Sequence, residues 1–142
     1  MTGRGLLIAA AVGDVLAALA HLAAIVGGAN WYRFMGAGPH MAAMVERGLA
    51  KPHLITLGIA AVLLGWAAYA LSGAGVIGRM PLLRTGLVAI SIVCIVRGLM
   101  VFGPFTAARD APPGFWIWSS LIVLGLGLLH AVGTYLVWPR LR

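Results

Sequence analysis

The chain has 142 residues, of which 62% are hydrophobic and 9% are charged, and its mean hydropathy is +1.03. Soluble domains carry about 25% charged residues, so this composition excludes an ordinary soluble fold and predicts one integral membrane domain over residues 1–142. The net charge is +7, but the basic residues are scattered through short loops and the termini. We therefore expect membrane lipids as partners and no nucleic acid.

The first apolar stretch covers about residues 5–26. It predicts a transmembrane helix rather than a cleaved signal peptide, because it is long and carries Asp14 near its centre. Asp14 and His21 are seven residues apart, which places both side chains on one helix face, two turns apart. The run Gly27-Gly28-Ala29-Asn30 is expected to end this helix.

A short helix is predicted over about residues 39–47, between the first and second spans. Pro39 suits the first position of a helix, and Gly48 suits the position just past its end. Met41 and Met44 give this segment an apolar side. We expect an interfacial or re-entrant helix rather than a loop.

Three further apolar stretches are expected to cross the membrane, at about residues 52–72, 83–102 and 115–137. The last is about 34 Å long at about 1.5 Å per residue, enough for a hydrocarbon core of about 30 Å. The sequence thus predicts an all-α, four-helix membrane bundle. Cys94 is the single cysteine of the sequence, so an intrachain disulfide is excluded.

The charge of the loops predicts the orientation. Five basic residues fall on the side of the termini and four on the other side: Arg4, Arg79, Arg84, Arg140 and Arg142 against Arg33, Arg47, Lys51 and Arg109. Positive residues favour the cytoplasmic side. We expect an integral protein of a bacterial inner membrane with both termini cytoplasmic.

An inner polar layer is predicted from depth. Counting the helical rise from the helix ends places Asp14 and His130 at similar depth. A carboxylate in hydrocarbon is costly, so a histidine at its depth is expected to share its proton. We predict that Asp14 and His130 approach each other and carry proton coupling. The alternative is that their hydrogen bond only joins two helices.

An outer polar layer is predicted around Arg97, a permanently charged residue inside the third span. Its counter-charge is expected from Glu46, Asp110, a lipid headgroup or a bound substrate. We predict that Arg97 is buried against the first or the fourth span rather than facing lipid. The alternative is that Arg97 extends to a lipid phosphate. The predicted substrate-binding residues are Arg97, His21, Ser119, Ser120, Glu46 and Trp116.

The histidines raise the question of haem and metals. His21 and His130 differ in expected depth by roughly 13 Å, too much for the two axial ligands of one haem iron. A mixed donor set of His40, Glu46, His53 and His21 matches no strong metal-binding spacing. The sequence therefore predicts no metal site and indicates no particular cofactor.

The leading functional hypothesis is the binding or transport of a small anionic or lipid-like molecule, with proton coupling at Asp14 and His130. One alternative is a non-enzymatic accessory or assembly subunit of a membrane complex. Another is a membrane enzyme acting on a lipid or quinone, so the question of enzymatic activity stays open. A homo-oligomer or a partner membrane subunit is compatible with each. A cavity reaching Arg97 and His21 would favour a binding protein over an accessory subunit with a dry core.

Overall fold

The computed structural model describes residues 2–102 and 113–141, and this part of the chain is almost entirely helical and contains no strand. Within these ranges lie five α-helices: α1 (Gly3–Phe34), α2 (Pro39–Glu46), α3 (Lys51–Gly73), α4 (Leu83–Leu99) and α5 (Pro113–Val137). Short 3₁₀ helices follow two of them, η1 (Met100–Phe102) after α4 and η3 (Trp138–Leu141) after α5.

The described chain is all-helical, which confirms the predicted all-α class, and four of its helices are long and apolar enough to cross a membrane, in agreement with the four predicted spans. The exterior is apolar: Leu16 on α1 is 60% exposed and Ile122 on α5 is 61% exposed. The interior is instead rich in small residues, and Ala10 and Ala18 are completely buried. Helices in lipid are held together by close packing of small residues and by polar contacts, so this arrangement suits a membrane.

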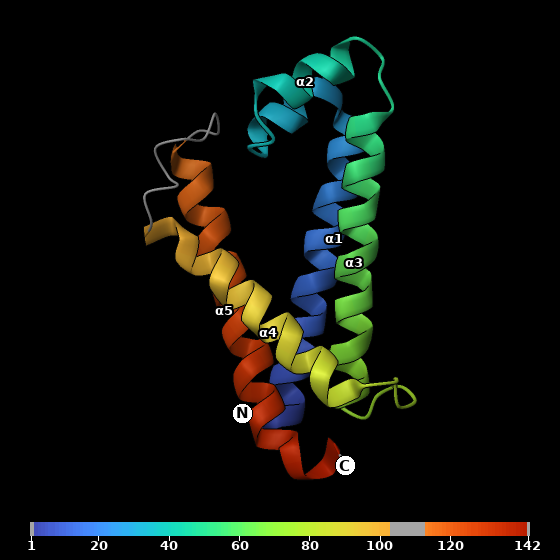
Figure 1. The fold of residues 1–142 in the computed structure, drawn as a ribbon, viewed down its shortest axis with the longest axis vertical. Helices are drawn as coiled ribbons and strands as arrows, with labels where there is room; N and C mark the ends of the chain where they lie inside the picture. The colour runs from blue at the N-terminus through green and yellow to red at the C-terminus, as the bar shows by residue number, and fades with distance from the viewer. Residues whose placement is uncertain (1, 103–112, 142) are drawn as a thin grey trace.

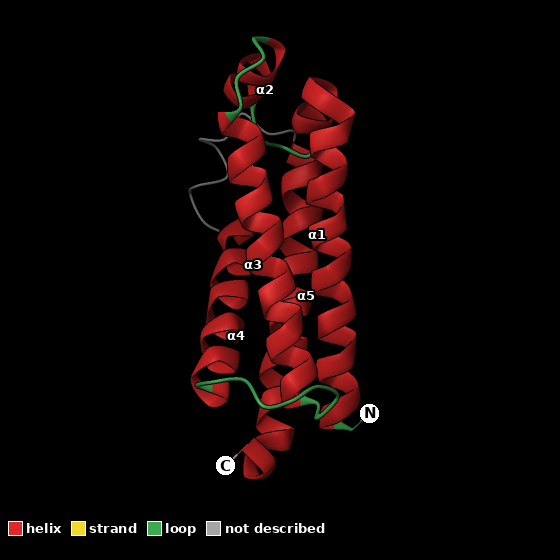
Figure 2. Ribbon diagram, turned by 90° about the vertical axis from the view of Figure 1, so that its right-hand side faces the viewer, coloured by secondary structure: helices red, strands yellow, loops and turns green. Residues whose placement is uncertain are grey.

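The long helices form two pairs. α1 packs mainly against α3, and α4 packs mainly against α5, while contacts between α1 and α5 join the pairs. In Figure 1, α4 and α5 lean away from α1 and α3 toward the end of the molecule that carries α2. In Figure 2 the long helices run along the same axis, with both chain ends together and α2 at the opposite end.

α1 consists of two helical segments that meet at a kink. The regular helix is interrupted at Gly28, whose backbone has φ 69° and ψ −159°, and a second helical segment continues to Phe34. A positive φ is cheap only for glycine, so Gly28 permits this sharp change of direction. The break agrees with the predicted end of the helix at the glycine run, whereas the helical segment beyond it was not predicted. The continuation buries Tyr32, which is only 2% exposed, against α3.

α4 and α5 come into close contact at Gly98. A Cβ atom built on Gly98 would lie 2.6–2.7 Å from the Cβ, Cα and backbone nitrogen of Leu124. Backbone atoms cannot move aside as a flexible side chain can, so only glycine allows this helix spacing. The preceding residue, Arg97, is thereby held beside the first turns of α5.

α2 covers Pro39–Glu46, the segment predicted to be a short helix, with Pro39 in its first turn. Gly38 precedes it with φ 87°. Ala42 is completely buried, and the helix packs against α1 and α3. α2 therefore covers the end of the α1–α3 pair.

Candidate functional site: a central polar pocket

A pocket of about 290 Å³ lies between the helix pairs and is lined by residues of α1, α3, α4 and α5. Its walls are mostly apolar and include Trp66 and Phe115. Its polar lining consists of Asp14, His21, Cys94, Arg97 and Ser119. The structure thus brings residues of both predicted polar layers to one cavity, and the centre of the bundle is not closely packed throughout.

Asp14 and His130 meet at the centre of the bundle, as predicted. Nε2 of His130 lies 2.9 Å from Oδ2 of Asp14, and both side chains are completely buried. The proton of this hydrogen bond can reside on either atom, which makes the pair a candidate for proton exchange. Asp14 is among the residues around the pocket, so the pair lies directly behind its wall.

Both partners retain polar atoms without a hydrogen bond in the described part of the chain. Oδ1 of Asp14, Nδ1 of His130 and Oγ1 of the neighbouring Thr134 are buried and unpartnered there. Buried polar atoms almost always have a partner, either from the protein or from ordered water. The centre of the bundle is therefore able to take further hydrogen bonds from water or from a ligand.

Arg97 contacts α5, the fourth span, as predicted, but its side chain is only partly buried. Its Nη1 donates to Oγ of Ser120 over 3.0 Å, and its guanidinium lies 4.2 Å from the centroid of the Trp116 ring. A cation over an aromatic face contributes about 1 kcal/mol. Ser119, one residue away, lines the pocket and donates to the carbonyl of Trp116 over 3.1 Å. α5 therefore fixes the position of the charge.

The two polar pairs lie at different levels of the pocket. Ser120 and His130 are ten residues apart on α5, which corresponds to about 15 Å along the helix. The pocket is therefore long: Arg97 lies toward the α2 end and Asp14 lies deeper in the bundle. This agrees with the two layers predicted from depth.

His21 connects this pocket to a second one. Its Nδ1 donates to the carbonyl of Ala17 over 2.7 Å, so Nε2 is the ring nitrogen left for a partner in the pockets. The second pocket, of about 270 Å³, lies beneath α2, and His21, Met35 and Ile59 line both cavities. The two pockets therefore adjoin at these three residues.

Sequence reasoning missed a polar cluster beside the second pocket. The hydroxyl of Tyr32 lies 3.1 Å from both Nδ1 of His53 and Oγ1 of Thr56. Tyr32 and Thr56 line that pocket, and the rings of Tyr32 and His53 pack edge to face. The kink at Gly28 brings Tyr32 to α3. The glycine run was correctly interpreted as a break in the helix, but the helical segment after the break, which carries Tyr32, was not predicted.

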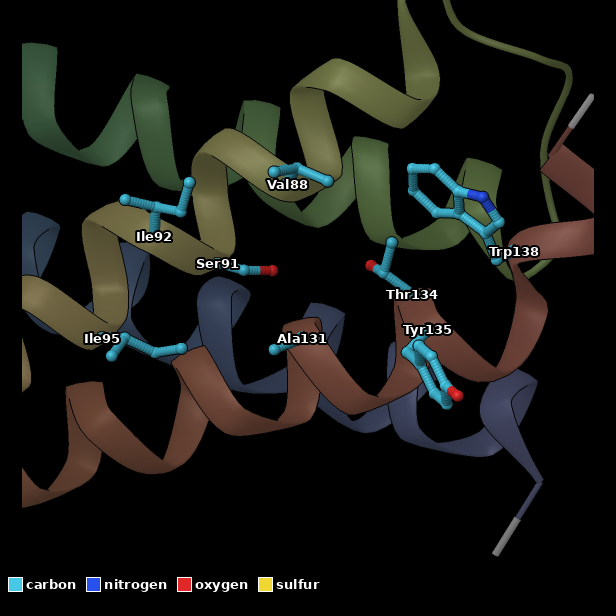
Figure 3. Close-up of a pocket in the computed structure, with 8 residues that line it drawn as sticks. All are labelled: Val88, Ser91, Ile92, Ile95, Ala131, Thr134, Tyr135 and Trp138. Atoms are coloured by element: carbon cyan, nitrogen blue, oxygen red, sulfur yellow. The ribbon is translucent and has the colours of Figure 1, made fainter.

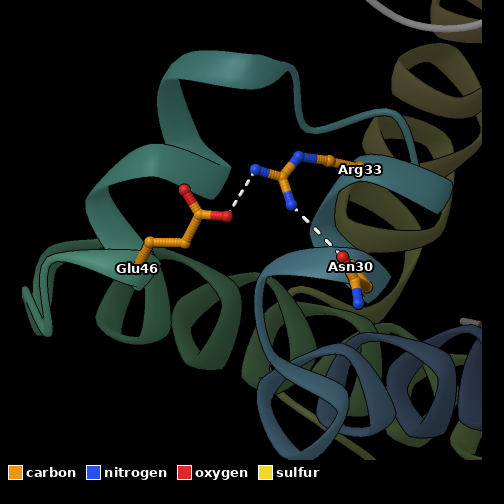
Figure 4. A network of polar contacts seen from close by, with 3 residues as sticks. All are labelled: Asn30, Arg33 and Glu46. Atoms are coloured by element: carbon orange, nitrogen blue, oxygen red, sulfur yellow. Dashed lines mark hydrogen bonds and ion pairs between the residues drawn. The ribbon is translucent and has the colours of Figure 1, made fainter.

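The predicted binding residues are divided by the structure: Arg97, His21 and Ser119 line the pocket, Ser120 and Trp116 contact Arg97, and Glu46 lies elsewhere. It forms an exposed ion pair with Arg33, which also donates to Oδ1 of Asn30 over 3.2 Å (Figure 4). This contact joins α2 to the end of α1. Asp110, the other candidate counter-charge for Arg97, lies outside the described residues.

A larger groove of about 450 Å³ runs between α4 and α5 (Figure 3). Ser91 and Thr134 point into it from the two helices, and Tyr135 and Trp138 lie at one end. The hydroxyl of Ser91 donates to the carbonyl of Leu87 over 2.7 Å. The remaining lining is aliphatic, and the groove contains none of the charged residues, so the candidate site is the central pocket.

No group of three or more His, Cys, Asp and Glu side chains within residues 2–102 and 113–141 is arranged to hold a metal ion. The mixed set of His40, Glu46, His53 and His21 therefore does not assemble.

Comparisons with protein-family models, with curated protein sequences and with solved structures found no match. The functional argument rests on the geometry of the central pocket.

Proposed function

We propose that this protein binds a small anionic amphiphile in the central pocket and takes up a proton at Asp14 and His130 when it does so. The observation that carries the proposal is that Arg97 and His21 line one pocket whose other walls are largely apolar. A guanidinium is always charged and suits a carboxylate or phosphate. The apolar walls suit a short hydrocarbon tail, and the volume falls at the lower end of the range for ligand pockets.

The proton coupling has an electrostatic reason. A bound anion near Arg97 would lie about 15 Å from the Asp14–His130 pair, following the helical rise. At an effective dielectric constant of about 20, a unit charge at this distance contributes about 1 kcal/mol. An incoming negative charge therefore favours a proton on the buried pair. Binding and protonation support each other.

The proposal also includes the location and the orientation of the molecule in the membrane. The chain would span a bacterial inner membrane with both termini cytoplasmic, and α2 would lie at the opposite surface. The pocket is lined by Met35 and Phe115, which lie at the α2 ends of α1 and α5, and this supports access from that side. A homo-oligomer or a partner membrane subunit is compatible with this arrangement.

The binding test uses a dibrominated undecanoate as the probe, because bromine quenches tryptophan fluorescence at short range and Trp66 lines the pocket. The purified protein in detergent should show saturable quenching by the carboxylate but not by its methyl ester. Trp66→Phe should remove most of this signal. Arg97→Gln should weaken binding at least about tenfold, as expected for the loss of a charged hydrogen-bonding partner.

Arg84→Gln is the matched control. Arg84 also lies on α4 and stacks on a tryptophan, with 4.7 Å to the Trp138 ring, but it does not line the central pocket. Its replacement should leave probe binding unchanged. Equal binding by the Arg97→Gln and Arg84→Gln variants, or equal quenching by acid and ester, would contradict the proposal and favour an accessory role.

A further inference from the structure

We propose a second anion site at the opposite end of the molecule, one that binds a phosphate-bearing group. A pocket of about 340 Å³ is lined there by Arg4, Arg79 and Arg140. These residues come from the first turn of α1, from the connection between α3 and α4, and from η3. The chain ends and the α3–α4 connection lie together at this end in Figure 1. The site is distinct from the central pocket and does not depend on its function.

The backbone around this pocket is held in place. Oγ of Ser72 donates to the carbonyl of Gly78 and accepts from the backbone nitrogen of Met80, each over 3.0 Å. The residue between these two contacts is Arg79, whose Nη2 donates to the carbonyl of Leu141 over 2.8 Å. The connection is thus tied to α3 and to η3. A preorganised site binds its ligand with a smaller entropy cost.

The charge of the pocket favours an anion. Among the described residues, its lining contains three arginines and no acidic residue. The acids in the described part of the chain are engaged elsewhere, Asp14 with His130 and Glu46 with Arg33. Arginine binds phosphate through paired hydrogen bonds.

The surroundings fit a group at the membrane surface. Leu83, Val137 and Leu141 are buried and give the pocket an apolar floor. The pocket lies at the ends of four apolar helices, α1, α3, α4 and α5, which is the level of lipid headgroups for helices of this length. Basic pockets between membrane helices bind anionic headgroups. Two sources of the phosphate are open to test: a phospholipid such as phosphatidylglycerol, and free phosphate.

The first arm of the test is a competition for lipid. The full chain in dodecyl maltoside is mixed with equal amounts of phosphatidylglycerol and phosphatidylcholine, and retained lipid is counted by native mass spectrometry. The wild type should retain phosphatidylglycerol preferentially. R4Q/R140Q should weaken this retention about 30-fold, from the usual contribution of two basic residues near an anionic lipid. R47Q/K51Q removes the same charge at the α2 end and should retain lipid as the wild type does.

The second arm uses inorganic phosphate without phospholipid, followed by the line width of its phosphorus resonance. Broadening by the wild type that is lost in R4Q/R140Q supports the site with free phosphate as its ligand. Preferential lipid retention without such broadening supports a headgroup. If R4Q/R140Q loses its helical circular dichroism, R140Q is compared with R47Q by the same criteria. If the variants at the arginine pocket and the control variants at the α2 end behave alike in both the lipid and the phosphate experiments, the proposal is overturned.

Discussion

At the scale of single residues, the centre of the protein depends on one buried acid. Asp14 and His130 are each completely buried and bonded to each other, and each has a second polar atom without a partner in the described structure. Leaving one member of such a pair alone in a dry core is costly, whereas replacing both by apolar groups of similar size can be almost neutral.

Replacement of Asp14 therefore separates packing from proton exchange. Asp14→Asn keeps an oxygen that can accept from Nε2 of His130, so the free energy of unfolding should fall by less than about 1 kcal/mol. Asp14→Leu leaves the imidazole of His130 without its hydrogen-bond partner and should lower the free energy of unfolding by about 1–3 kcal/mol. Both quantities are measured by denaturation in mixed micelles. The proton uptake that accompanies probe binding, followed with a pH-sensitive dye, should disappear in Asp14→Asn.

The double variant D14L/H130F provides the control. It removes both polar partners, so it should be more stable than Asp14→Leu alone. If Asp14→Leu unfolds like the wild type, the hydrogen bond contributes nothing to packing. If Asp14→Asn retains proton uptake, the proton is taken up elsewhere.

At the scale of the elements, the contact between α4 and α5 determines the position of Arg97. A side chain at Gly98 would collide with the backbone of Leu124. Arg97 and Ser120 lie on the two helices that meet there. The spacing of this pair of helices is thus coupled directly to the geometry of the candidate anion site.

Gly98→Ala should force α4 away from α5. We expect a loss of about 1–3 kcal/mol in the free energy of unfolding, typical of overpacking, together with weaker probe binding. Gly125→Ala on α5 is the matched control, because a Cβ atom there meets nothing within 4 Å. Alanine is the better helix former by about 1 kcal/mol, so Gly125→Ala should be neutral or stabilising. A tolerated Gly98→Ala with unchanged binding would show that the helices can separate freely.

At the scale of the whole molecule, two helix pairs enclose a pocket between them, and both chain ends lie opposite α2 (Figure 2). An even number of spans places both chain ends on one side of a membrane. The proposed anion sites then lie toward opposite surfaces, Arg97 toward the α2 side and the three arginines on the side of the termini.

Labelling with a membrane-impermeant maleimide tests this topology in a Cys94→Ala background. His40→Cys should react in intact bacterial cells. Thr2→Cys and Arg140→Cys should react only after the inner membrane is permeabilised. The reverse pattern would show the termini outside, and labelling of Thr2→Cys and Arg140→Cys from different sides would contradict the four-span topology.

The sequence by itself determined the class and the spans of this protein. A membrane helix satisfies its backbone hydrogen bonds internally, so length and hydropathy are local properties that the sequence displays directly. The depth of a residue along its helix can also be read from the sequence, because it follows from the rise per residue. Counting along the helices therefore placed Asp14 beside His130 and predicted two polar levels.

Only the tertiary structure decided which side chains face one another around the pocket. Adjacent residues of a helix point about 100° apart. Counting residues from the helix ends does not tell how each helix is rotated about its own axis. It was the rotation of α5 that selected Ser120 for the bond to Arg97 and turned Ser119 toward the pocket. The bend at Gly28 likewise depends on packing. It places Tyr32 against α3, and the chain beyond it leads to α2, where Glu46 pairs with Arg33 rather than with Arg97.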